Sequence, residues 1–158
     1  MRRCLLLAAA LAIAGCQTTP VSYFSTTPQP IGDAYSCALR KVNELGYTVT
    51  NTNREAGFIT ADKQTTGMFT KAFTGSEYHD VITVSVFDDP ASGGRKIRVT
   101  AGTSDHQSSL LGTSSNNIAP SDKGQKDAST ILSTCGEGPV TKQSSLAPQA
   151  AIYERAGM

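Results

Sequence analysis

Residues 79–88 read HDVITVSVFD, and they carry the strongest structural signal in the chain. Ile82, Val84 and Val86 occupy every second position, with Thr83 and Ser85 between them. This period of two predicts a β-strand that buries one face and leaves the other partly solvated. Such a strand is typical of an antiparallel sheet that is covered on one side only.

The same kind of pattern recurs on both sides of this stretch and predicts three further strands. We expect them at 47–51, 58–63 and 95–103, the last with Ile97, Val99 and Ala101 directed inward. A turn at 53–57 and a proline- and glycine-bearing loop at 89–94 would join neighbouring strands.

Two helices are expected outside these strands. Residues 31–46 place apolar side chains at three- and four-residue spacing and end at Gly46. A second helix should begin at Ser121 or Asp122 and run to about Cys135. The order of helix, four strands and helix predicts an α+β fold, a four-stranded antiparallel sheet with both helices packed on one face.

Two segments between these elements leave their roles open. Residues 64–76 are polar but contain Met68, Phe69 and Phe73, which could either cover one end of the core or contact a partner protein. Residues 104–121 are rich in serine, asparagine and glycine and are expected to form a long loop.

The N-terminal segment has the organisation of an export signal. Arg2 and Arg3 precede an apolar run at 4–14. That run is about half the roughly 20 residues that a transmembrane helix needs, so we expect removal after export.

The end of this run resembles a lipobox, the motif of bacterial lipoproteins, in the residues Ile13-Ala14-Gly15-Cys16. The resemblance implies a signal peptide at 1–15 and a lipid anchor on Cys16, which would hold the protein to a membrane. Residues 16–30 would then be a tether, in which 21–25 could form a short strand, 31–136 the folded domain and 137–158 a disordered tail. Gln17, in place of aspartate, favours the outer membrane with the domain facing the periplasm.

Processing would change the cysteine count. Cys4 would leave with the signal peptide and Cys16 would carry lipid, so Cys37 and Cys135 remain in an oxidising compartment. We expect them to form a disulfide. The alternatives are two buried thiols or a metal site. A metal site would need further ligands at suitable spacing, and the two histidines of the sequence lie in no such motif.

Two short stretches, Leu45-Gly46-Tyr47-Thr48-Val49 and Gly57-Phe58-Ile59-Thr60-Ala61, are similar to BamC-like helix-grip domains of envelope lipoproteins. This resemblance implies the same helix-and-sheet architecture. It also favours a role within an envelope assembly.

The remaining residues favour binding over catalysis. The formal charge of +1 becomes −1 without Arg2 and Arg3, which gives no basic face for nucleic acid. No nucleophile or phosphate-binding motif occurs, and His79 and His106 flank expected loops. We therefore expect a non-enzymatic binding or scaffold module with a protein partner in the envelope and no cofactor or metal. A small-ligand or lipid carrier and an envelope hydrolase using His79 or His106 are the alternatives.

Overall fold

Seven strands form one antiparallel sheet in the computed structural model, which describes residues 20–90, 93–109 and 112–143. The order across the sheet is β2-β3-β4-β5-β1-β7, and β6 pairs with β5 beyond the start of β1. The strands are β1 (Val21–Thr27), β2 (Thr48–Asn53), β3 (Phe58–Gln64), β4 (Ser76–Asp89), β5 (Gly94–Ser109), β6 (Gly112–Ile118) and β7 (Thr141–Gln143).

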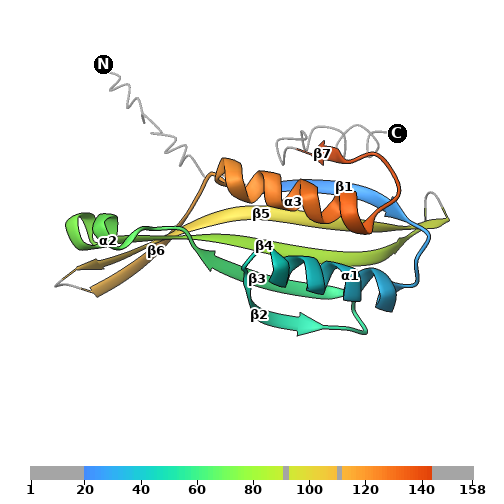
Figure 1. Ribbon diagram of the computed structural model, residues 1–158, viewed down its shortest axis with the longest axis horizontal. Helices are drawn as coiled ribbons and strands as arrows, with labels where there is room; N and C mark the ends of the chain where they lie inside the picture. The colour runs from blue at the N-terminus through green and yellow to red at the C-terminus, as the bar shows by residue number, and fades with distance from the viewer. Residues whose placement is uncertain (1–19, 91–92, 110–111, 144–158) are drawn as a thin grey trace, which may run out of the picture.

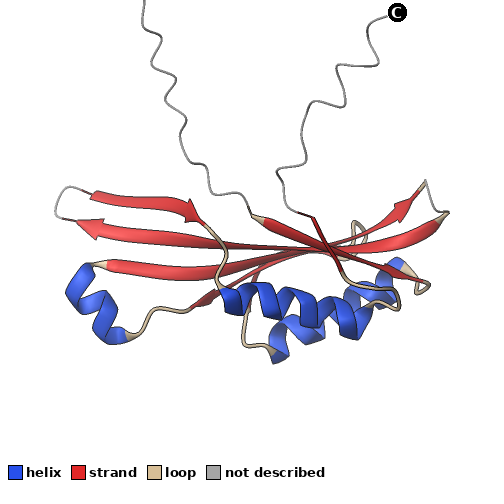
Figure 2. Ribbon diagram, turned by 90° about the horizontal axis from the view of Figure 1, so that it is seen from above, coloured by secondary structure: helices blue, strands red, loops and turns tan. Residues whose placement is uncertain are grey.

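Three helices accompany this sheet in the described residues: α1 (Ile31–Glu44), α2 (Met68–Thr74) and α3 (Asp122–Cys135). The two long helices, α1 and α3, lie side by side on one face of the sheet (Figures 1 and 2). Both were expected from the sequence. The Ser121 side chain begins α3 by accepting a hydrogen bond from the Gly124 amide at 2.9 Å.

The prediction of a four-stranded sheet was wrong, although the α+β class is broadly right. Three strands come from polar segments: β1 from the expected tether, β6 from the expected loop at 104–121 and β7 from the expected tail. β5 also continues to Ser109, and α2 forms within the expected loop at 64–76. Ser25 and Thr27 of β1 are only 3% exposed, so this strand buries hydroxyl-bearing side chains that produce no hydrophobic alternation.

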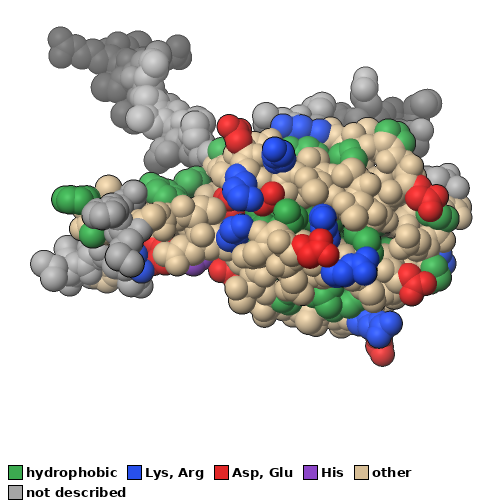
Figure 3. Space-filling view, in the orientation of Figure 1, with side chains coloured by type: hydrophobic (Ala, Val, Ile, Leu, Met, Phe, Trp, Pro, Cys, Tyr) green, Lys and Arg blue, Asp and Glu red, His purple; other side chains and the backbone are tan. Residues whose placement is uncertain are grey.

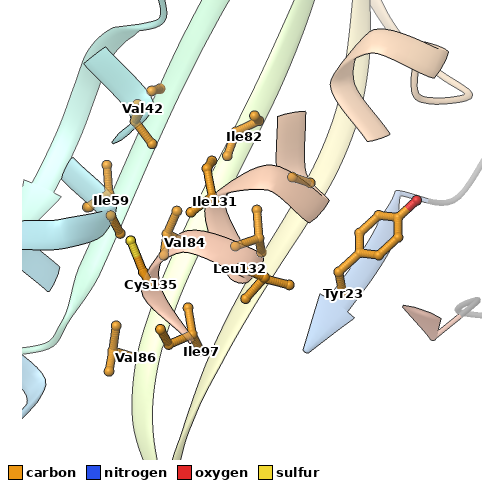
Figure 4. Close-up of a cluster of buried hydrophobic side chains, with 14 of the residues drawn as sticks. Tyr23, Val42, Ile59, Ile82, Val84, Val86, Ile97, Ile131, Leu132 and Cys135 are labelled. Atoms are coloured by element: carbon orange, nitrogen blue, oxygen red, sulfur yellow. The ribbon is translucent and has the colours of Figure 1, made fainter. Parts of the chain in front are cut away.

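The core lies between the sheet and the two long helices. β4 contributes the alternating residues that the sequence singled out, and β5 contributes Ile97, Val99 and Ala101. Ile131 and Leu132 of α3 are fully buried against them (Figure 4). The opposite face of the sheet carries no long helix in the described part of the chain (Figure 2).

A disulfide joins the two long helices at this core. Cys37 of α1 and Cys135 of α3 are bonded, with their Cα atoms 5.8 Å apart. The expected pairing is therefore confirmed, and it links the middle of α1 to the C-terminal end of α3 through two cysteines that are 98 residues apart in sequence.

Candidate functional site

One end of the sheet extends beyond the two long helices and forms a projecting arm (Figures 1 and 2). We use "the arm" for residues 65–80 and 102–118, which comprise α2, the beginning of β4, the end of β5 and all of β6. Function is often located on such a segment, because a rigid scaffold positions it while its surface stays available.

A buried carboxylate fixes the base of the arm. Asp80 is 1% exposed and accepts hydrogen bonds from the hydroxyls of Thr103 at 2.8 Å and Ser121 at 2.7 Å. The amide of Ser121 in turn donates to Thr103 Oγ1 at 3.0 Å. Asp80 therefore ties β4, β5 and the N-terminus of α3 together, where the helix dipole also favours a negative charge.

A second buried carboxylate stabilises α3 one turn further along. Asp127 accepts a hydrogen bond from the Tyr47 hydroxyl at 3.2 Å and pairs with Lys123 at 2.6 Å. Burial raises the pKa of Tyr47, and the charges of Asp127 and Asp80 raise it further. The hydroxyl therefore stays protonated and remains a hydrogen-bond donor.

The two histidines of the chain meet on the face of the arm that Asp80 does not share. His79 Nδ1 lies 3.1 Å from Asp62 Oδ2, and the rings of His79 and His106 are 5.0 Å apart at their centroids. His106 Nε2 lies 3.1 Å from Ser104 Oγ. The sequence placed both histidines beside loops, whereas they lie within β4 and β5 and contact each other.

The backbone around this cluster is held in the paired strands of the sheet. Ser104 is 8% exposed and lies within β5, where the backbone pairs with β4 and leaves no free pair of amides for an oxyanion. Among the described residues, no group of three histidine, cysteine, aspartate or glutamate side chains is arranged to hold a metal ion. The cluster instead cross-links three strands through their side chains.

An ion pair connects α2 to the beginning of β4 within the arm. Lys71 Nζ lies 2.6 Å from Glu77 Oε2, and the hydrogen bond from Lys71, with a smaller effect of His79, lowers the pKa of Glu77. Phe73 of the same helix is 86% exposed. The structure therefore places Phe73 outside the core. The predictions for the Met68 and Phe69 side chains lie outside what the structure describes.

Phe73 and Val140 are the exposed large hydrophobic side chains of the described residues, and Phe73 is much the more exposed of the two. Figure 3 shows acidic and basic side chains interspersed over the helix-covered body. A single exposed aromatic side chain is not unusual on a protein surface, but a nearly fully exposed phenylalanine on a projecting helix is a candidate contact point.

A small hollow lies where β1 begins and β6 ends, on either side of Gly102. It has a volume of about 250 Å³. Its lining includes Pro20, Val81, Thr83, Thr100, Gly102 and Ile118. This volume is below the roughly 300–1,000 Å³ of most small-molecule sites, which argues against a dedicated ligand pocket.

The sequence did not reveal the Asp80 network, although one signal for it was present. The alternation that buries Ile82, Val84 and Val86 extends back to position 80 and predicts an inward side chain there. Cys4 and Cys16, by contrast, lie outside the described residues, so the structure does not test the lipobox.

Comparisons with known proteins add no family to these observations. No protein-family model matches the chain, and no curated protein matches it. Within the described residues, no helix is both long enough and apolar enough to cross a membrane.

Proposed function

We propose that the chain is an envelope lipoprotein, anchored to the outer membrane through a lipid on Cys16, whose domain is a non-enzymatic binding module facing the periplasm. The Cys37–Cys135 disulfide supports an oxidising compartment. β1 begins at Val21, inside the segment 16–30 that was expected to be a tether, so only a few residues separate Cys16 from the sheet. Four residues from Cys16 to Pro20 span at most about 14 Å, so the anchor would hold the domain close to the membrane surface.

The observation that carries the binding role is Phe73, which is 86% exposed on the arm. The arm is braced at its base by Asp80 and along its side by the Lys71–Glu77 pair, so Phe73 is presented from a supported position. Binding surfaces commonly use such an aromatic anchor on a rigid element. We propose that the partner is another envelope protein.

Catalysis and lipid transport have less support. Ser104 and His106 are in contact, but neither lines the hollow at Gly102. The hollow at Gly102 is also too small to enclose a whole acyl chain, since each buried methylene needs its own volume within the site.

Site-specific photocrosslinking in intact cells tests the binding role. A photoreactive phenylalanine analogue replaces Phe73, and the matched control carries the analogue at Glu55, an exposed position in the β2–β3 turn. We expect a discrete adduct with one envelope protein from position 73 alone. Identical adducts from both positions, or no adduct from either, would contradict a binding role for α2.

Membrane attachment is tested separately. The Cys16→Ser chain should move from the membrane fraction to the soluble fraction and keep its signal peptide, whereas Cys4→Ser should be processed and retained normally. If the Cys16→Ser chain is processed and stays in the membrane fraction, the anchor is not on Cys16.

A further inference from the structure

Alternation along the strands places two phenylalanines and an arginine together on the side of the sheet away from α1 and α3, which we call the open face (Figure 2). Val86 and Ile97 are buried toward the helices, so the next residues along their strands, Phe87 and Arg98, point to the open face. Phe24 of β1 lies directly beside Arg98 and shares its side of the sheet. The two phenylalanines are partly exposed and Arg98 is exposed, so this cluster is accessible from outside.

Arg98 carries a positive charge that no acidic side chain of the described residues balances. Its guanidinium carbon lies 5.9 Å from the centre of the Phe87 ring. Lys96, two positions earlier on the same face, pairs with Asp89 at 2.7 Å, whereas none of the described carboxylates forms an ion pair with Arg98. A guanidinium in this position favours a negatively charged partner, such as a phosphate group that it can bind with two hydrogen bonds.

The chain enters the sheet on this same face. Ala101 and Thr103 are buried on the helix side, so Gly102 between them faces the open side. A Cβ on Gly102 would lie 3.8 Å from the Cβ of Pro20, which places Pro20 over the open face. Pro20 also lines the hollow there, together with Val81.

The short connection to Cys16 limits which surface meets the membrane. The four residues from Cys16 to Pro20 span at most about 14 Å. The helix layer is itself about 10–12 Å thick, and the sheet lies between that layer and the open face. A membrane within this reach of Pro20 therefore meets the open face before it meets the outer surface of α1 and α3.

Acidic side chains on the open face do not oppose contact with an anionic surface. Each carboxylate that alternation places on this face of the described strands has a basic side chain within 3.1 Å. These pairs are Asp89 with Lys96, Glu77 with Lys71 and Asp62 with His79. The charge of Arg98 therefore dominates around the two phenylalanines.

We propose that the open face rests on an anionic membrane surface, with Phe24 and Phe87 among the lipid headgroups and Arg98 binding lipid phosphate. Aromatic side chains combined with basic residues are typical of proteins that bind the interface of anionic bilayers. Figure 2 shows α2 on the same side of the sheet as α1 and α3, so this contact leaves α2 directed away from the membrane. The inference rests on the proposed anchor at Cys16, and it adds which face of the domain meets the bilayer.

Tryptophan fluorescence tests the contact, because the chain has no tryptophan of its own. The lipidated full chain is reconstituted into vesicles of phosphatidylglycerol and phosphatidylcholine with brominated acyl chains, since bromine quenches a tryptophan that enters the bilayer. Phe87→Trp and Phe24→Trp report from two strands of the open face. The matched control is Ser133→Trp, at an exposed position of α3. Flotation of the vesicles measures the anchor independently.

Brominated lipid should reduce the emission of Phe87→Trp and Phe24→Trp by about twofold or more and leave that of Ser133→Trp unchanged. A chain that floats without quenching, or with equal quenching at all three positions, would overturn this inference and leave the anchor standing. A chain that does not float contradicts the anchor, and this inference with it. Emission from position 87 that shifts with protein concentration in the absence of vesicles would assign the open face to a second copy of the chain and overturn the membrane contact.

The charge of Arg98 is tested within the Phe87→Trp chain by Arg98→Gln. Arg40→Gln is the matched control, because Arg40 is an exposed arginine of α1. Arg98→Gln should lower the ratio of quenched to unquenched protein about fivefold, the effect of one basic residue near an anionic surface, whereas Arg40→Gln should leave it unchanged. The difference should vanish in vesicles of phosphatidylcholine alone. No effect of Arg98→Gln, or an equal effect of both variants, would overturn the binding of lipid phosphate by Arg98.

Discussion

At the scale of single residues, Tyr47 couples the stability of the domain to alkaline pH. Burial, and then the charges of Asp127 and Asp80, raise its pKa above the usual value near 10. Above pH 10 the unfolded chain loses this proton while the folded chain keeps it. The free energy of unfolding should therefore fall as pH rises past 10, by up to about 1.4 kcal/mol per pH unit.

Urea unfolding between pH 8 and pH 11 measures this slope in the unmodified chain and in Tyr47→Phe. In Tyr47→Phe the slope above pH 10 should lack the contribution of one proton. At pH 8 the free energy of unfolding should be lower by about 1 kcal/mol, because the hydrogen bond to Asp127 is lost. Tyr23→Phe is the matched control, because it also removes a tyrosine hydroxyl bonded to a side chain, that of Gln125. If the free energy of unfolding of Tyr47→Phe falls just as steeply with pH, a group other than Tyr47 causes the alkaline loss of stability.

Gly57 shows a different single-residue constraint, in which space matters as well as backbone conformation. Its φ is +61°, and a Cβ there would lie 2.6 Å from the Val86 carbonyl oxygen. We expect Gly57→Ala to cost about 2–4 kcal/mol, the sum of a left-handed alanine and a backbone shift. Gly93→Ala is the control, because Gly93 has a φ of +67° in open space and should cost only about 1 kcal/mol. Equal losses in urea unfolding would show that the contact with Val86 costs nothing.

At the scale of elements, the disulfide between α1 and α3 should carry a large share of the stability. The disulfide closes a loop between residues that are 98 positions apart, which stabilises the fold by about 4–5 kcal/mol at most in the chain-entropy description. Replacing Cys37 and Cys135 together with alanine should remove up to this amount in urea unfolding. Reductant should bring the unmodified chain to the stability of the double variant and leave the double variant unchanged. An unmodified chain indifferent to reductant would show that the bond contributes little.

Substitution of Phe73 tests whether α2 serves binding or the core. Because the side chain is 86% exposed, Phe73→Ser should change the free energy of unfolding by less than about 0.5 kcal/mol. The same change should abolish capture of the envelope partner. Phe58→Ser, at a half-buried strand position, is the contrasting variant and should lower the melting temperature. A large loss of stability from Phe73→Ser would return this residue to a role in the core.

Apart from β2, whose residues are mostly exposed, the elements that the sequence predicted are those that bury aliphatic side chains on one face. Ile82, Val84 and Val86 repeat every second residue because one side of β4 contacts the helices, and α1 repeats Ala34, Ala38 and Val42 for the same reason. β1 gives no such signal because two of its three buried residues, Ser25 and Thr27, carry hydroxyls. β6 gives none because the residues from Ser114 to Asn117 are exposed, so their pairing depends on the backbone alone.

At the scale of the whole molecule, the chain divides into a cross-linked body and an arm. The disulfide joins the helices of the body, and Asp80 joins that body to the arm through Thr103 and Ser121. The candidate site could not be predicted from the sequence because it arises at this division. His79 and His106 come together only when β4 and β5 pair beyond the helices, and the sequence indicated that His106 lay in a loop.

This division predicts what happens when the connection at Asp80 is weakened. Asp80→Asn keeps the shape of the side chain but presents an amide N–H₂ to one of the two hydroxyls that donate to Asp80. We expect a loss of about 1–3 kcal/mol in urea unfolding. Amide exchange should accelerate at Gly124 and in β5 from Thr103 onward, and stay unchanged in the β2–β3 hairpin.

Asp122→Asn is the matched control for Asp80→Asn, since Asp122 is an exposed carboxylate in the first turn of the same helix. It should change exchange at the start of α3 only slightly, because an exposed charge near a helix terminus contributes about 0.3–1 kcal/mol. If Asp80→Asn accelerates exchange uniformly through body and arm, the arm is no separate unit and unfolds only with the whole domain. If exchange rises in the arm and at Gly124 alone, Asp80 is the residue through which the body holds the arm in place.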